Sequence, residues 1–326
     1  MDRRAFICGA AGLAVAAPVA SMAQQPGRSY RMCWLSSGAA RTESYNVALV
    51  QRLRDLGFVE GRNLTIEFRS AEGRTERLGQ LAADLARQSC DLFLAPGTDA
   101  NLRAVEQASR DTPIVVVATD YDPVATRHVA SLARPGGRVT GVSHLQSDLP
   151  AKRIELLKQL VPGAKTIAVL SDTASSDQLA LTQAAAARLG IALAVHEFKR
   201  APYDYERAFA EFAQARSDAF LAMASGLFVA ARQTIPALAT KHRLPSMFNN
   251  RLWAENGGLL SYGVNFSMTY RRAAEQIAMI LNGAKPMDIP MEQASAVELV
   301  VNLKTAKALG IAVPPAVLAR ADEVIQ

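Results

Sequence analysis

The sequence is poor in the residues that bind metals and build disulfide frameworks. It has three cysteines and four histidines in 326 residues. Beyond the first 23 residues only Cys33 and Cys90 remain, and neither lies in a CxxC pair or at ligand spacing from a histidine. Structural metal sites need such spacing, so we expect no metal and no cofactor. A disulfide is one alternative in an oxidising compartment, but two buried thiols are the interpretation favoured here.

Short motifs of common enzyme classes are also missing. The chain has no GxSxG elbow, no P-loop, no HExxH and no GxGxxG placed between a strand and a helix. We therefore expect a protein that is not an enzyme. An enzyme built on an α/β scaffold remains an alternative.

Charge of one sign is not concentrated anywhere. Lys and Arg number 36 against 30 Asp and Glu, for a formal net charge of +6, and the two signs are interspersed. A nucleic-acid surface would need clustered basic residues, so we expect no nucleic-acid partner.

The first 23 residues have the features of a signal peptide. Arg3 and Arg4 precede an uncharged run over residues 5–20, and small residues lead to a cleavage site near Ala23. The run is too short for a typical membrane span, and no cysteine stands at the cleavage point for lipid attachment. The paired arginines fit the twin-arginine (Tat) route, and the Sec route fits almost as well. Either route predicts a protein of the periplasm.

From Tyr30 onward, short β-rich runs alternate with amphipathic helical stretches. This rhythm predicts parallel strands joined by crossover helices, and at this length two domains are expected. The first lobe has expected strands at 31–35, 64–68, 92–95, 114–118 and 139–143. The second has expected strands at 166–170, 192–197, 219–223, 245–248 and 259–264, and a further strand is expected at 297–302. The fold class is therefore α/β, with two doubly wound parallel-sheet lobes.

Ligands of parallel α/β sheets bind beyond the carboxyl ends of the strands. Applied to both lobes, this rule selects the candidate ligand-binding residues Ser36, Ser37, Gly97, Thr98, Asp120, Asp122, His144, Ser171, Asp172, Ser225, Asn249 and Tyr262.

Five of these residues, at three strand ends, suggest a chemistry. Gly97 and Thr98 stand between a strand and a helix, where backbone N–H groups can hold a carboxylate, although Thr98 could instead cap the helix. Asp120 and Asp122 would suit an ammonium group or sugar hydroxyls, but Asp122 precedes a proline and could simply start a turn. His144 could face the ligand or serve the structure alone.

Several long motifs occur together in one order along the chain. They are residues 56–64 (LGFVEGRNL), 119–125 (TDYDPVA), 131–142 (SLARPGGRVTGV), 300–310 (VVNLKTAKALG) and 319–325 (ARADEVI). This combination resembles the ABC-transporter substrate-binding family related to tryptophan- and tyrosine-binding proteins, over essentially the whole chain after the signal peptide.

The resemblance implies a type I periplasmic-binding fold with three crossovers. They should fall near 145–150, 263–267 and 285–291. The implied N-terminal lobe comprises residues 24–146 and 267–285, and the implied C-terminal lobe comprises 147–266 and 286–326.

The function implied is that of an exported solute-binding protein of an ABC importer. It would capture a small polar or amphipathic molecule, amino-acid-like or aromatic, in the cleft between the lobes and deliver it to an ABC permease in the inner membrane. It would act as a monomer. A sensor that reports the ligand to a membrane receptor is the alternative.

Overall fold

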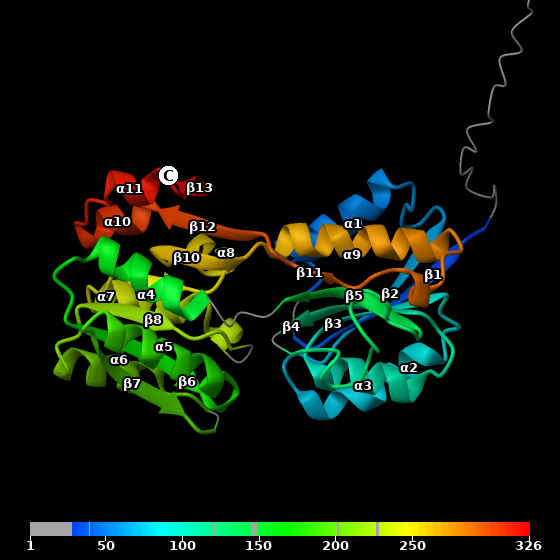
Figure 1. Ribbon diagram of the computed structural model, residues 1–326, viewed down its shortest axis with the longest axis horizontal. Coiled ribbons are helices and arrows are strands. Elements are labelled where there is room, and N and C mark those ends of the chain that lie inside the picture. The colour runs from blue at the N-terminus through cyan, green and yellow to red at the C-terminus, as the bar shows by residue number, and fades with distance from the viewer. Residues whose placement is uncertain (1–27, 39, 120, 145–148, 201, 226–227) are drawn as a thin grey trace, which may run out of the picture.

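The computed structural model describes residues 28–326 except 39, 120, 145–148, 201, 226–227 and the side chains of 174 and 177 (Figure 1). The expected signal peptide and the candidate residue Asp120 lie outside the described residues. The described chain forms two sheets, each with helices on both faces, joined by crossings in the middle of the molecule (Figure 1). The expected architecture of two α/β lobes is thus confirmed.

The first sheet has the strand order β11-β5-β4-β3-β1-β2, and every pairing in it is parallel. Its strands are β1 (Tyr30–Ser36), β2 (Leu64–Ser70), β3 (Leu92–Gly97), β4 (Ile114–Thr119), β5 (Val139–His144) and β11 (Glu292–Gln293). Apart from their first or last residues, β1, β3, β4 and β5 are buried throughout. Such near-continuous apolar strands are typical of parallel sheets covered on both faces.

Two pairs of helices cover this sheet. The helices are α1 (Ser44–Asp55), α2 (Leu78–Ala86), α3 (Asp99–Ala108) and α9 (Phe266–Leu281), with short 3₁₀ turns at Thr75–Arg77 and Pro286–Asp288. Trp34 of β1 packs in the core beneath α1 and α9, whereas the next residue, Leu35, packs in the core beneath α2 and α3. The two-residue period of a strand therefore supplies two cores from one sheet.

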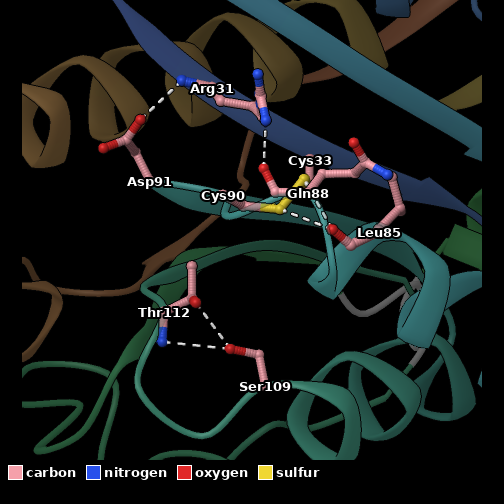
Figure 2. The surroundings of a disulfide bond; sticks show 8 residues. All are labelled: Arg31, Cys33, Leu85, Gln88, Cys90, Asp91, Ser109 and Thr112. Carbon is pink, nitrogen blue, oxygen red and sulfur yellow. Dashed lines mark hydrogen bonds between the residues drawn. A yellow bond between two sulfur atoms is a disulfide. The ribbon is translucent and has the colours of Figure 1, made fainter.

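Cys33 and Cys90 are joined in a disulfide, with their Cα atoms 5.7 Å apart (Figure 2). Cys33 lies on β1 and Cys90 just before the neighbouring strand β3, where Arg31 and Asp91 also exchange backbone and side-chain hydrogen bonds. The preference for two free thiols is therefore wrong. Pairing of β1 with β3 brings the two Cα atoms within the usual disulfide separation.

The second sheet has the order β13-β12-β10-β9-β8-β6-β7. All its pairings are parallel except that of β10 with β12. Its strands are β6 (Thr166–Asp172), β7 (Ala192–Phe198), β8 (Ala219–Ala222), β9 (Ser246–Phe248), β10 (Leu260–Val264), β12 (Val297–Asn302) and β13 (Glu323–Ile325). The short terminal strand β13 gives no alternating pattern and was not expected from the sequence.

Helices again cover both faces of the second sheet. They are α4 (Leu149–Leu160), α5 (Ser176–Arg188), α6 (Tyr205–Gln214), α7 (Thr234–Lys241), α8 (Arg251–Glu255), α10 (Leu303–Leu309) and α11 (Pro315–Leu318), with 3₁₀ turns η2 (Thr173–Ser175) and η3 (Phe228–Ala231). One core contains Leu157 and Val301, and the other contains Phe209 and Trp253. The ring of Phe248 stacks on that of Trp253, with the ring centroids 4.9 Å apart.

The chain passes between the lobes three times (Figure 1). The first passage leads from β5 to α4, partly through residues outside the described set, and the second joins β10 to α9 at Asn265. The third lies between β11 and β12, at 294–296, and not at 285–291 as the resemblance implied. Ile289 accepts a hydrogen bond from Thr140 (2.8 Å) and β11 pairs with β5, so residues 286–293 pack on the first lobe instead of the second.

Candidate functional site

The carboxyl ends of both sets of parallel strands lie on the side of each sheet that faces the other lobe. The chain leaves the first sheet at the carboxyl end of β5 and leaves the second at the carboxyl end of β10, and the other parallel strands of each sheet run in the same direction. We call the region formed by these strand ends and the three crossings the interlobe junction. Eleven of the twelve candidate residues belong to its strand ends or to the loops that follow them, and the twelfth, Asp120, lies outside the described residues.

In the first lobe, Ser36, Ser37, Gly97 and Thr98 lie together at the ends of the paired strands β1 and β3. Gly97 has a φ of +118°, and a Cβ there would lie 2.6 Å from the Ser37 hydroxyl oxygen, so only glycine fits. Thr98 is the residue before α3 and is exposed, but its side chain makes no capping hydrogen bond within the described chain. The hydroxyl of Thr98 is therefore not used to cap the helix.

Asp99 and Asp122 are engaged in local structure. Asp99, in the first turn of α3, accepts hydrogen bonds from Arg103 (2.6 Å) and His128 (2.7 Å). Burial alone would raise the pKa of the Asp99 carboxyl, but these two partners hold it below its ordinary value. Asp122 is exposed and accepts the backbone N–H of Val124 at 2.8 Å. Its side chain therefore stabilises the turn that follows β4.

His144 ends β5 and is fully buried. Its ring packs edge-to-face on Phe266, the first residue of α9, with ring centroids 5.1 Å apart. Neither ring nitrogen has a hydrogen-bond partner among the described residues. Burial lowers the pKa of His144 to about 4, so the imidazole is neutral at physiological pH.

In the second lobe, the carboxylate of Asp172 is the centre of a group of hydroxyls at the end of β6. Asp172 is fully buried and accepts hydrogen bonds from Ser175 (3.0 Å), Ser225 (2.5 Å) and Tyr203 (3.4 Å). Ser171, the preceding residue, is also fully buried. Asp172 and Ser225, expected from different strand ends, are thus brought into direct contact.

Asn249 and Tyr262 lie nearer the second crossing. Asn249 is buried at the end of β9, and its carbonyl oxygen would be only 1.7 Å from a Cβ placed on Gly263 of β10. The carbonyl of Tyr262 accepts a 2.8 Å hydrogen bond from Arg153, a fully buried arginine of α4. The hydrogen bond from Arg153 ties α4 to β10 through the backbone carbonyl of Tyr262.

An ion pair joins the two lobes across the junction. Arg232, which follows η3 in the second lobe, lies 3.6 Å from Glu43, which precedes α1 in the first. Tyr45 is nearby, packed against Phe266 and Tyr270. Burial raises the pKa of the Tyr45 phenol, the Glu43 carboxylate raises it further, and Arg232 opposes them.

The comparisons with known proteins agree with this architecture. The sequence profile of the family described as "ABC transporter substrate binding protein" matches residues 37–325. The chain belongs to this family of ABC transporter substrate-binding proteins. The resemblance seen in the sequence motifs is thereby confirmed.

Individual relatives of this substrate-binding protein are also similar to it in sequence and fold. A "Tyrosine-binding protein" of Clostridioides difficile is 27% identical over 272 residues, which are 80% of this chain and 74% of the relative. A conserved domain protein of Vibrio cholerae has a TM-score of 0.78 at 25% identity, over 91% of this chain and all of that one. An ABC domain of Streptococcus pneumoniae, solved with L-Trp, has a TM-score of 0.75 at 24% identity with the same coverage. The type I periplasmic-binding fold is thus established.

Four residues of the substrate-binding protein's junction were missed from the sequence. Tyr203 lies in the loop before α6 and reaches Asp172. Arg153 shows no sign of burial in its sequence context, and Glu43 and Arg232 are too far apart in sequence for their pairing to be foreseen. A tyrosine in the loop after a parallel strand could have been selected by the strand-end rule.

Other kinds of site receive no support in the part of the chain that the structure describes. No group of three or more His, Cys, Asp or Glu residues could hold a metal ion there, and no described helix is long and apolar enough to cross a membrane. Two pockets, of about 330 and 460 Å³, lie away from the strand ends. The first is lined by Leu56, which follows α1, and by α9 and the residues after it, and the second by residues of α7 and α10 and by Gly257.

Proposed function

We propose that this substrate-binding protein is exported to the periplasm and captures a small amphipathic, amino-acid-like molecule between its lobes for an ABC permease in the inner membrane. The observation that carries the proposal is that the polar strand ends of both sheets face one junction. Ligands of open α/β sheets bind at such carboxyl ends. A molecule that contacts both lobes stabilises the closed form by its differential affinity for it.

The two halves of the junction offer different chemistry to such a molecule. The first lobe presents the exposed Thr98 beside Gly97 at the start of α3, where backbone N–H groups favour a carboxylate. The second lobe presents hydroxyls gathered around the carboxylate of Asp172. The relatives described as tyrosine-binding and as complexed with L-Trp support an amino-acid-like ligand.

We further propose how the protein is exported and how it delivers its ligand. Residues 1–23 direct export through the Sec or Tat route, and the mature chain acts as a monomer that releases its ligand chemically unchanged. It binds no nucleic acid. Docking of the closed form on the permease then delivers the ligand.

A thermal-shift screen with the twenty amino acids and simple aromatic acids tests the proposal. A bound ligand raises the melting temperature by mass action, and Thr98→Ala should abolish the rise because the hydroxyl is exposed at the end of β3 and does not cap α3. Thr65→Ala, at an exposed position near the amino end of β2, is the matched control and should keep the rise. Absence of any shift, or equal shifts in both variants, would contradict the assignment.

A further inference from the structure

The hydroxyl groups around Asp172 come from separate segments and converge on one buried carboxylate. Ser175 comes from η2, Tyr203 from the loop after β7, and Ser225 from the loop after β8. Ser225 and Tyr203 share the oxygen Oδ2, whereas Ser175 binds Oδ1. Asp172 is fully buried, but Ser225 and Tyr203 are only partly so.

The arrangement fixes the direction of each hydroxyl proton. An ionised carboxylate accepts hydrogen bonds and donates none. The single protons of Ser225 and Tyr203 therefore point inward to Asp172, and their oxygen atoms act only as acceptors toward any other group. Burial, together with the charge and the hydrogen bond of Asp172, raises the pKa of the Tyr203 phenol, so its proton is retained.

Aromatic rings pack around Tyr203, one of the residues that donate a hydroxyl to Asp172. Tyr203 stacks on Phe198, the last residue of β7, with centroids 4.4 Å apart and planes 6° apart. Phe228 of η3 packs edge-on against both rings, and Tyr205 packs edge-on against Phe198. Phe198 and Phe228 are buried, so these rings keep water away from the carboxylate, whose charge acts strongly in a low-dielectric interior.

We propose that Asp172, acting through the hydroxyls of Ser225 and Tyr203, makes the second-lobe half of the junction a subsite for an alkylammonium group of the ligand. The subsite offers hydrogen-bond acceptors backed by a negative charge in apolar surroundings. It accepts N–H donors and disfavours a carboxylate or a carbonyl oxygen. This inference rests on the proposed function. It adds that the amine of the ligand contributes more to binding selectivity than its aromatic ring does.

Matched ligand pairs test the inference by calorimetry. The pairs are L-tyrosine with 3-(4-hydroxyphenyl)propionate and L-tryptophan with indole-3-propionate, which differ only in the amine. We expect the wild-type protein to prefer the amine-bearing member by at least about tenfold, as one charge-assisted hydrogen bond allows. Asp172→Asn should reduce this ratio to near one, and Asp111→Asn, at an exposed position before β4, should leave it unchanged.

A second variant covers the case in which Asp172→Asn does not fold. Tyr203→Phe keeps the stacked ring but removes one acceptor oxygen, so it should weaken binding of the amine-bearing member alone. The inference is overturned if both variants keep the wild-type ratio, or if the wild-type protein binds both members equally. Binding of none of the four compounds, together with no shift in the amino-acid screen, would overturn the amino-acid-like ligand of the proposed function and this subsite with it.

Discussion

Arg232 and Glu43 form an ion pair between the lobes, with Nη2 and Oε1 3.6 Å apart. The Glu43 side chain is only 11% exposed, so the carboxylate is largely removed from water in this arrangement of the lobes. The pair can exist only while α1 and η3 are close together. It therefore stabilises this arrangement relative to any arrangement with separated lobes.

Removing the interlobe ion pair should weaken ligand binding. Partly exposed ion pairs contribute about 0.2–1 kcal/mol, so Arg232→Met should raise the Kd by a factor of about 1.4 to 5. Calorimetry at low and high salt measures the effect. Glu43→Gln should do the same, and the double variant should be no worse than either single variant. Additive losses would show that the two residues act independently.

Burial of His144 should make stability fall in acid. Its pKa is about 4 in the folded protein against 6.5 for an unperturbed histidine, so the unfolded chain binds more protons between these pH values. Stability is therefore fully present above about pH 6.5 and is lost as the pH falls toward 4, by about 2–3 kcal/mol.

His144→Phe provides the comparison for this pH dependence. The substituted ring can keep its edge-to-face packing on Phe266 but has no proton to bind. Urea unfolding at pH 7 and pH 4.5 should show a larger loss of stability for the wild-type protein than for the variant. Parallel losses would mean that His144 is not the responsible group.

Reduction of the disulfide should destabilise the first lobe. Cys33 and Cys90 are 57 residues apart, and the chain-entropy model assigns about 4 kcal/mol to a loop of this size. Thermal unfolding with and without dithiothreitol measures the loss. The Cys33→Ala/Cys90→Ala double variant should not respond to the reductant. Two titratable thiols in the denatured, unreduced protein would contradict the bond.

Gly263→Ala should destabilise the second lobe strongly. The added Cβ would meet the carbonyl oxygen of Asn249 at 1.7 Å, so β9 and β10 would have to separate. Overpacking of this kind costs about 1–3 kcal/mol or more. Gly163→Ala is the control, because nothing lies within 4 Å of its added Cβ. Equal melting temperatures for the two variants would be inconsistent with this close approach.

The strand rhythm predicted the fold because parallel strands carry strong local signals. The apolar runs ending at Leu35 and Ala118 coincide with β1 and β4 to within one residue at their carboxyl ends. In contrast, β11 has only Glu292 and Gln293, neither with β propensity, and it forms because β5 offers an open edge. The third crossing was misplaced for this reason, since tertiary pairing overrode local preference.

The sequence predicted where the candidate site residues lie, but not which of their side chains contact one another. The strand-end rule selected Asp172 and Ser225 separately, but sequence spacing carries no information about the direction of a side chain. Tyr203 joins them only because the loop after β7 returns over the end of β6. The disulfide was misjudged for a related reason, because two cysteines at positions 33 and 90 have the same sequence signature whether bonded or free.

The late position of α9 and β11 in the chain has a consequence for biosynthesis. Domains of most multidomain proteins fold in order, N-terminal first, while the ribosome is still working. Here the first core lacks the helix that covers one face of its sheet until residue 281 has been made, and β11 is added only at residue 293. The sequence between them and β5 encodes most of the second lobe. The nascent first lobe therefore stays incomplete through most of translation, which gives chaperones a long interval in which to engage the unfolded chain.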